Sequence, residues 1–284
     1  MYKLGLIGIS IAKSSAPTLH TMLGEMYNLP VSYTLHDPEE NTREAFVKTL
    51  NQLREEGFRG CNVTFPFKQI AVGEVSSVND AVKKVGATNT LRITDSAIKA
   101  ANTDYTGFIR GYRGRVGDLP AGKVLLIGAG GVGRAIAFGL FDLGATEIMV
   151  YDMFEASAQS LVDTVKAAGY KASLVTQESF ADAALSADGL VNGTPVGHYK
   201  SPGIPLAAEL IGNQKWAFDA VYTPVDTEFL VTSHGKGLKI VSGFDLFFYQ
   251  GVDAFEIFTD VEVDPLPALK RFKETFGINS QLID

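Results

Sequence analysis

Short apolar runs alternate along this chain with segments whose apolar residues recur at helical spacing. The runs are rich in β-branched and aromatic residues, as strands buried in a sheet are. They cover residues 4–9, 32–36, 60–63, 124–127, 147–151, 189–191, 217–221 and 239–241. Regular alternation of strand and helix predicts an α/β fold with parallel sheets.

Two of the intervening segments carry clear signals for the ends of helices. Residues 41–56 should form a helix that Asn41 caps and Gly57 ends, and Pro17 suits the first turn before a helix at 18–27. The first of these helices has its apolar residues on one face: Ala45, Phe46, Leu50 and Leu53.

Glycines and prolines are concentrated in residues 105–122, and a new strand follows. We therefore expect one domain over residues 1–104 and a second over 105–244.

A glycine-rich turn follows the first strand of the second domain. The strand at 123–127 runs into a G-x-G-x-x-G sequence, and residues 134–143 read as an apolar helix. Its glycines would permit a tight turn, approach of the backbone to a pyrophosphate, and close packing of helix on strand. The helix N-terminus would then face the anion. The turn consists of Gly128, Ala129, Gly130, Gly131, Val132 and Gly133. It predicts a doubly wound, Rossmann-type dinucleotide-binding domain.

An acidic residue follows the next strand at the spacing that a ribose-binding carboxylate requires. Asp152 lies 19 residues (152 − 133) after Gly133, close to the roughly 20 expected. A carboxylate there accepts hydrogen bonds from ribose hydroxyls and repels a 2′-phosphate, and no Lys or Arg follows before Val165. This favours NAD over NADP. The alternative is that Asp152 only caps a helix that begins near Glu155.

Composition excludes several other classes of protein. The net charge is −7 with no basic stripe, so nucleic acid is not an expected partner. No apolar run approaches the length of a membrane span, and the N-terminus does not read as a signal peptide. The lone Cys61 suits a reducing compartment, so we expect a cytoplasmic protein. The histidines lack ligand spacing, so no metal site is expected: His20, His36, His198 and His234.

Six segments in this order resemble the shikimate/quinate dehydrogenase family over nearly the full length. The most specific are Asn62-Val63-Thr64-Phe65-Pro66-Phe67-Lys68 and Asn102-Thr103-Asp104. The other four span residues 14–20, 86–90, 219–222 and 243–251. The resemblance implies reversible hydride transfer between NAD and a ring hydroxyl of shikimate, quinate or a close analogue, with aromatic amino acid biosynthesis as the setting. It also implies a cleft between the two domains.

The resemblance further implies a role for each site residue. Lys68 and Asp104 match the catalytic pair, in which the lysine exchanges a proton with the substrate oxygen. The substrate ligands it implies are Ser14, Asn62, Thr64, Asn89, Tyr222 and Gln250. The turn beside the nicotinamide ribose would contain Asn192, Thr194 and Pro195. Because Gln250 must join the substrate site, residues 245–284 are expected to pack back onto the first domain.

Other interpretations of these residues stay open. Lys68 could be a solvated lysine at a helix start, and Asp104 could cap a helix at 105–112. Asn62, Asn89 and Asn192 could be turn residues, and Tyr222 and Gln250 could serve packing.

The chain also departs from the family pattern. Ala16 replaces a hydroxyl residue expected to bind the substrate carboxylate, and Asp245 stands where glycine is common. Because of Ala16, one alternative is that the substrate is a modified acid, such as an aminoshikimate-like acid. A second alternative is a non-catalytic NAD-binding regulator. The sequence is compatible with a monomer or a homodimer.

Overall fold

The computed structural model describes residues 1–283 and divides into two compact units. The first unit contains Met1–Thr106 and Phe248–Ile278, and the second contains Gly107–Phe247 with the described residues from Asn279 onward. Helices α4 (Thr103–Val116) and α9 (Gly243–Thr259) each contain one of these limits. Each helix therefore contributes residues to both units.

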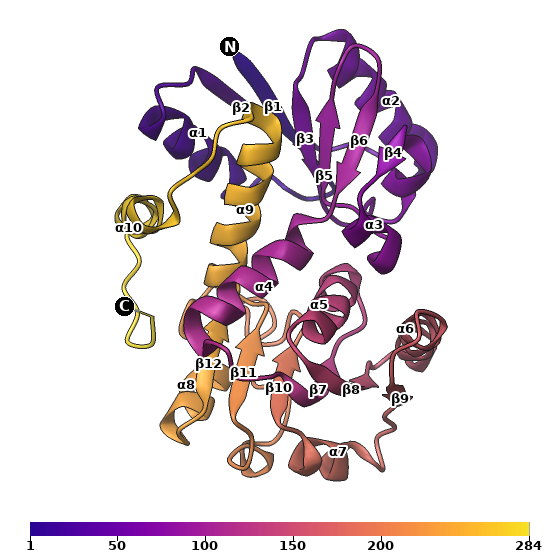
Figure 1. The fold of residues 1–284 in the computed structure, drawn as a ribbon, viewed down its shortest axis with the longest axis vertical. Helices are drawn as coiled ribbons and strands as arrows, with labels where there is room; N and C mark the ends of the chain where they lie inside the picture. Colours follow the sequence, from indigo (N-terminus) through magenta and orange to yellow (C-terminus); the bar gives the residue numbers. More distant parts are fainter. Residues whose placement is uncertain (284) are drawn as a thin grey trace. The chain divides into compact units, whose positions relative to one another are not determined.

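The first unit is built on a six-stranded sheet (Figure 1). Its strand order is β2-β1-β3-β5-β6-β4. Pairing is parallel between β2, β1 and β3 and between β4 and β6, but β5 runs antiparallel to both of its neighbours. The strands are β1 (Tyr2–Ile7), β2 (Val31–His36), β3 (Gly60–Val63), β4 (Ser77–Val78), β5 (Thr90–Ile93) and β6 (Ile98–Ala101).

Helices cover this sheet, and their ends follow local capping chemistry. The other helical elements of the first unit are α1 (Ala16–Met26), α2 (Arg43–Glu55), η1 (Ile70–Glu74), α3 (Asp80–Val85) and α10 (Pro265–Phe276). The apolar face predicted for α2 is buried, with Phe46, Leu50 and Leu53 in the core. The predicted cap was wrong: Thr42, not Asn41, accepts a hydrogen bond from the Ala45 N–H at 3.2 Å. Gly57 follows the helix with a positive φ, as predicted.

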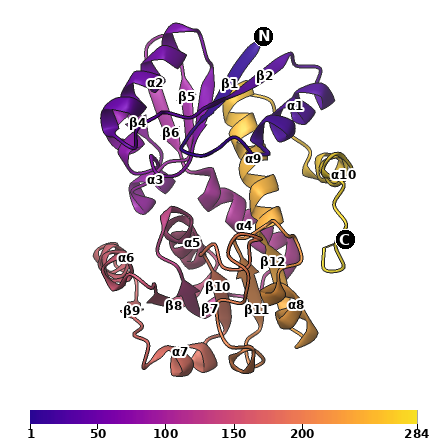
Figure 2. The ribbon, with the colours of Figure 1, turned by 180° about the vertical axis from the view of Figure 1, so that it is seen from behind.

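The second unit has a six-stranded, fully parallel sheet. Its order is β12-β11-β10-β7-β8-β9, the doubly wound order in which successive strands are added on one side of β7 up to β9 and then on its other side from β10. Figure 2 shows the same sheet from behind. The strands are β7 (Gly122–Ile127), β8 (Ala145–Tyr151), β9 (Ala172–Leu174), β10 (Gly189–Asn192), β11 (Trp216–Asp219) and β12 (Lys239–Ser242).

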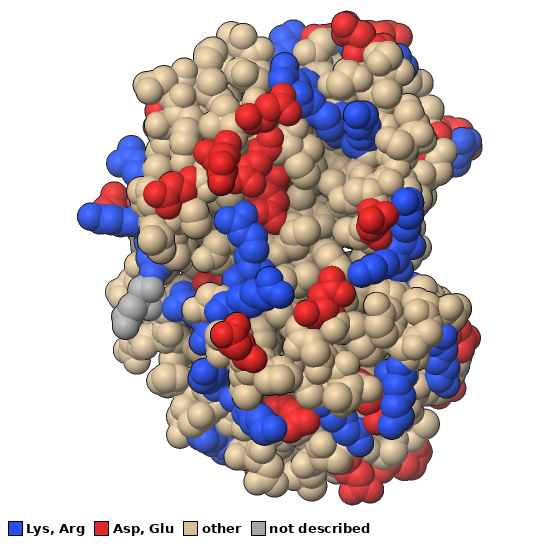
Figure 3. Space-filling model, viewed as in Figure 1, with Lys and Arg blue, Asp and Glu red and all other residues tan. Residues whose placement is uncertain are grey.

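Helices and a buried apolar layer complete the second unit. Its further helical elements are α5 (Gly131–Asp142), α6 (Glu155–Ala167), α7 (Phe180–Ser186), η2 (Ala208–Leu210) and α8 (Glu228–Gly235). Apolar side chains of α7 and α8 pack on β7, β10 and β11. None of the helices within residues 1–283 has the length and hydropathy of a membrane-spanning segment. On the face drawn in Figure 3, charged side chains of both signs are interspersed among uncharged ones.

Several strand limits differ from those the sequence predicts. The strand predicted at 4–9 lies at Tyr2–Ile7, because its register with β2 begins at Tyr2 opposite Val31. The strand predicted at 217–221 ends at Asp219, whose carboxylate accepts the Val221 N–H and turns the chain. Strands β4, β5, β6 and β9 were not predicted, because they are short and their apolar patterns are weak.

Candidate active site

A lysine and an aspartate form a closely spaced ion pair in the first unit. Lys68 Nζ lies 2.6 Å from Asp104 Oδ2, and the two side chains are only 13% and 10% exposed. Lys68 follows β3, and Asp104 is the second residue of α4. Lys68 is therefore not a solvated surface lysine. Asp104 does not cap α4 either, because Asn102 Oδ1 accepts the Tyr105 N–H at 3.0 Å.

A buried network of amides and hydroxyls fixes the start of α4 and with it Asp104. Asn89 Oδ1 accepts the Thr103 N–H at 2.7 Å, and Asn89 Nδ2 donates to Thr103 Oγ1 at 3.0 Å. Asn62 Nδ2 donates to the Asn89 carbonyl at 3.1 Å. Backbone hydrogen bonding extends the network to the lysine, because the Thr88 N–H donates to the Lys68 carbonyl. Asn62 and Asn89 thus do more than form turns: they join three chain segments around the ion pair.

Behind this network lies a stacked pair of rings that sequence reasoning missed. The Tyr33 hydroxyl donates to Asn62 Oδ1 at 2.8 Å, and the His20 ring stacks on Tyr33 with centroids 4.7 Å apart. His20 is 1% exposed, and its Nδ1 has no hydrogen-bond partner among the described residues. Burial lowers the pKa of His20 to about 3, and a hydrogen bond with Asn62 acts in the opposite direction by raising this pKa. The signal available in the sequence was the polar His20 within an apolar helical face.

The remaining predicted substrate ligands of the first unit come from three separate segments. Ser14 lies just before α1, and its Oγ accepts the Ala16 N–H at 3.3 Å, which leaves its own proton free to donate. Thr64 follows β3 and is partly exposed. Gln250 lies on α9, one turn before Asp253, which hydrogen-bonds the Thr106 hydroxyl of α4.

The glycine-rich turn of the second unit has the shape that a dinucleotide requires. Gly128 has φ +100°, and a Cβ on Gly133 would lie 2.1 Å from the Gly128 carbonyl oxygen. A Cβ on Gly130, by contrast, would meet no protein atom within 4 Å. Helix α5 begins at Gly131 with no side-chain cap. The turn thus leaves open space and uncapped N–H groups where a pyrophosphate would bind.

Asp152 lies beside this turn at the end of β8. Its Oδ2 accepts the Ala129 N–H at 2.8 Å, and its Oδ1 accepts the Phe154 N–H at 2.9 Å. Helix α6 begins later, at Glu155, with Phe154 in the N-cap position. Asp152 therefore does not cap α6, and its partly exposed carboxylate keeps lone pairs for sugar hydroxyls.

The turn after β10 is held rigid by a buried carboxylate. Asn192 Oδ1 accepts the Thr194 N–H and hydroxyl, and Asn192 Nδ2 donates to Asp219 Oδ1 at 2.9 Å. Pro195 follows on the exposed side of the turn. Asp219 also accepts the Thr227 hydroxyl at 2.6 Å, and burial raises the pKa of Asp219 to about 6. The family resemblance includes Asp219 in the segment 219–222 but implies no role for it.

Tyr222 follows β11 in the second unit. Its ring stacks on Phe247, with centroids 5.0 Å apart and an interplanar angle of 3°. Burial raises the pKa of Tyr222, although 36% of the residue is exposed to solvent. The stack on Phe247 thus covers part of the Tyr222 ring.

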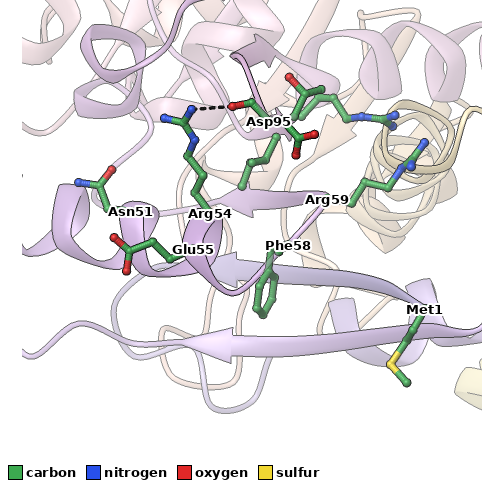
Figure 4. Close-up of a pocket in the computed structure, with 11 residues that line it drawn as sticks. Met1, Asn51, Arg54, Glu55, Phe58, Arg59 and Asp95 are labelled. Atoms are coloured by element: carbon green, nitrogen blue, oxygen red, sulfur yellow. Dashed lines mark hydrogen bonds between the residues drawn. The ribbon is translucent and has the colours of Figure 1, made fainter.

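An open basin of about 750 Å³ in the first unit lies at the opposite end of β3 from Lys68 (Figure 4). It is lined at the N-terminal side of β3 and the C-terminal end of β5, whereas Lys68 follows the C-terminal end of β3. Two of its arginines, Arg59 and Arg92, are already paired with Asp260 at 2.7 Å each. The basin contains none of the predicted site residues. Within residues 1–283, no three His, Cys, Asp or Glu residues gather as a metal ion would need.

The strand order and glycine-rich turn of the second unit define an NAD(P)-binding domain. Residues 6–91 match the family model described as the shikimate dehydrogenase substrate binding domain. The chain is 32% identical over 278 residues to a quinate/shikimate dehydrogenase (NAD(+)) of Corynebacterium efficiens, covering 96% of each chain. It is also 32% identical to a shikimate dehydrogenase (NADP(+)) of Pseudarthrobacter chlorophenolicus, covering 96% of this chain and 94% of that one.

A solved structure agrees with these sequence matches. The quinate dehydrogenase of Corynebacterium glutamicum, in complex with NAD, superposes with a TM-score of 0.89 at 30% identity, covering 96% of this chain and 99% of the other. The chain belongs to the shikimate/quinate dehydrogenase family of oxidoreductases. The relatives differ in cofactor, so membership establishes an NAD(P)-dependent enzyme.

The burial of His20 predicts a pH dependence of stability. Because the folded state favours neutral His20, the stabilisation is present above the unfolded pKa of 6.5 and is lost as the pH falls towards 3. Between pH 7 and pH 5, wild type should lose about 2 kcal/mol more of its unfolding free energy than His20→Phe. Urea denaturation followed by circular dichroism measures both. A His234→Gln variant, altered on an exposed face of α8, should follow wild type. If the unfolding free energies of wild type and His20→Phe depend on pH in the same way, His20 is not held neutral in the folded state.

Proposed function

We propose that this chain catalyses the reversible, NAD-linked oxidation of a ring hydroxyl on shikimate, quinate or a close analogue. The observation that carries the proposal is the shielded Lys68–Asp104 ion pair, which the Asn62–Asn89 network holds in place. An ammonium group fixed by a carboxylate is a cation placed to stabilise an alkoxide. The polar groups around it suit a polyhydroxy ring, whose hydroxyls need both donors and acceptors.

Lys68 would exchange a proton with the reacting oxygen. Bound NAD would supply the hydride acceptor for the carbinol carbon, and its reduced form would supply the hydride donor for the reverse reaction. In the oxidation direction the neutral Lys68 amine takes the hydroxyl proton; in reduction the ammonium returns it to the developing alkoxide. Asp104 stabilises the ammonium form and accepts a hydrogen bond from a neighbouring substrate hydroxyl. The side chains proposed to hold the ring in the first unit are Ser14, Asn62, Thr64, Asn89 and Gln250.

The cofactor would bind to the second unit through three groups of residues. The turn at 128–133 would hold the pyrophosphate, with Gly131 and Val132 offering backbone N–H groups. Ala129 would line the turn, since its own N–H is donated to Asp152. Asp152 would accept hydrogen bonds from the adenosine ribose. Asn192, Thr194 and Pro195 would form the surface beside the nicotinamide ribose. Open space at Gly130 and the free lone pairs of Asp152 support this arrangement.

Removal of the lysine tests the proposed chemistry. Lys68→Ala should lower kcat by about 10²–10⁴-fold, because general acid–base catalysis contributes that much. The Kd for NAD, measured by calorimetry, should change little. Lys83→Ala is a matched control, because Lys83 also pairs with an aspartate but is 64% exposed; both constants should stay at wild-type values. Near-normal turnover by Lys68→Ala would remove this residue from the mechanism.

The preference for NAD over NADP is tested by comparing the two cofactors. Asp152 should disfavour a 2′-phosphate, so kcat/KM should be higher with NAD than with NADP. Asp152→Asn should lower the ratio of kcat/KM with NAD to kcat/KM with NADP, because the negative charge that repels the 2′-phosphate is removed. Asp163→Asn, on α6, should leave the ratio unchanged. Equal or better use of NADP by wild type would contradict the assignment of Asp152.

Ala16 predicts weak binding of the shikimate carboxylate. It is the first residue of α1, and the missing hydroxyl removes a hydrogen bond to a charged group, which contributes about 1.5–3 kcal/mol. Wild type should therefore have a high KM for shikimate, and Ala16→Ser should lower it by roughly ten- to a hundredfold.

Measurements of kcat/KM for shikimate and quinate decide this question. Ser15→Ala is the control, because the Ser15 side chain makes no capping hydrogen bond. A low-micromolar KM for shikimate in wild type would contradict the prediction. If Ala16→Ser gains nothing on either acid, the argument from Ala16 is wrong, and a modified substrate such as an aminoshikimate-like acid is favoured instead.

A further inference from the structure

Tyr33 reaches across the sheet of the first unit to a residue of the proposed site. It lies on the edge strand β2, opposite Leu4 of β1, and Leu4 in turn is opposite Gly60 of β3. Asn62 follows two residues after Gly60, so its side chain lies on the same face of the sheet. The Tyr33 hydroxyl donates to Asn62 Oδ1 at 2.8 Å. One tyrosine thus joins the edge of the sheet to an inner strand.

The ring that carries this hydroxyl is itself tightly packed. Tyr33 lies against a buried apolar cluster that includes Phe258 of α9. The His20 ring stacks on Tyr33 with centroids 4.7 Å apart and an interplanar angle of 14°. His20 in turn lies between this ring and two phenylalanines of α9, Phe255 and Phe258, at centroid distances of 6.2 and 5.8 Å. The hydroxyl is therefore the polar end of a ring that has little freedom to move.

Several partners together determine the orientation of the Asn62 amide. Its Nδ2 donates to the Asn89 carbonyl at 3.1 Å and to Thr90 Oγ1 at 3.2 Å, so both of its N–H donors are used. Asn62 is only 6% exposed, so water does not readily replace a partner that is lost. Rotation of the amide by half a turn would place its oxygen against the Asn89 carbonyl. The Tyr33 hydroxyl, as a donor to Oδ1, stabilises the opposite orientation.

A short series of buried hydrogen bonds leads from this amide to the ion pair. Thr90 Oγ1 and Thr103 Oγ1 lie 2.9 Å apart, and Asn89 Oδ1 accepts the Thr103 N–H at 2.7 Å. Thr103 is the first residue of α4, and Asp104 is the second. Asp104 Oδ2 lies 2.6 Å from Lys68 Nζ. The position of Asp104 therefore depends on the same two residues that receive the donors of the amide.

We infer that Tyr33 is a positioning residue for the Lys68–Asp104 pair and acts on it through the amide of Asn62. This inference rests on the proposed function, in which the pair exchanges a proton with the substrate. The Tyr33 hydroxyl bonds Asn62 and neither of the charged groups, so its effect is indirect. Its removal broadens the range of positions that the carboxylate and the ammonium adopt, and catalysis is sensitive to such displacements.

Removal of the hydroxyl alone tests this role. Tyr33→Phe keeps the stacked ring, and kcat with shikimate or quinate should fall by about two- to thirtyfold, the range expected for a residue that acts through such a network. The Kd for NAD, measured by calorimetry, should be unchanged, because the cofactor is proposed to bind to the second unit. Tyr27→Phe is the matched control. The Tyr27 hydroxyl accepts the Asp264 N–H at 2.8 Å in the same unit, and its loss should leave kcat at the wild-type value.

A double-mutant cycle with Asn62→Ala tests the route. If Tyr33 acts through the amide, Tyr33→Phe should lower kcat no further in the Asn62→Ala background. Thermal unfolding sets an assay temperature at which every variant is folded, and Asn62→Ser, which also lacks the amide, replaces Asn62→Ala if that variant does not fold.

Three results would overturn the inference and leave the proposed function intact. They are a multiplied loss of kcat in the double variant, a loss of kcat in Tyr33→Phe that is accompanied by an equal loss of NAD affinity, and a wild-type kcat for Tyr33→Phe beside the impaired kcat of Lys68→Ala. Near-normal turnover by Lys68→Ala would instead remove the proposed function on which the inference rests.

Discussion

The arrangement of the first unit depends on keeping two opposite charges together in a site that water barely reaches. A lone ammonium or carboxylate in such surroundings carries a large desolvation penalty, and the penalty is reduced only when the partner stays within contact distance. The fold meets this constraint by tying together the segments that carry the charges. The backbone of Lys68 is bonded to Thr88, and Asn89 next to it holds the first residue of α4. Asp104 then follows as the next residue of that helix.

The second unit is organised in a similar way around the buried carboxylate of Asp219. The carboxylate of Asp219 accepts donors from Asn192, Val221 and Thr227, which lie on three different segments. The turn after β10, the segment leading to Tyr222 and the start of α8 are thereby fixed to one another. In both units, polar side chains near the carboxyl ends of strands hold neighbouring loops in fixed positions by hydrogen bonds. The side chains on those loops then need little rearrangement to bind a ligand.

Features of the fold and of the candidate site could be predicted where a short, continuous stretch of sequence carries the signal. The turn at 128–133 was found because its glycine spacing lies within one strand–turn–helix unit. The structure shows the positive φ of Gly128 and the close approach of Gly133 to the Gly128 carbonyl oxygen. Short strands such as β5 and β6 were missed because their existence depends on pairing with each other. The cap of α2 was misplaced by one residue, since Asn41 and Thr42 are both good caps and only the backbone decides between them. The structural roles of Thr103 and Tyr33 depend on contacts between segments that are far apart in the sequence, and no local sequence pattern reveals such contacts.

The carboxylate of Asp152 is bonded to the Ala129 N–H, so the residue proposed to select the cofactor is also part of the scaffold of the glycine-rich turn. The same side chain is thus proposed to select the cofactor and helps to order the turn beside it. A chain that drifts towards a phosphorylated cofactor by exchanging this acid for a basic residue would gain a partner for the phosphate and lose the acceptor that orders the turn. Such a change would therefore carry a penalty for both cofactors at once. Restoring the order of the turn would require another acceptor for the Ala129 N–H.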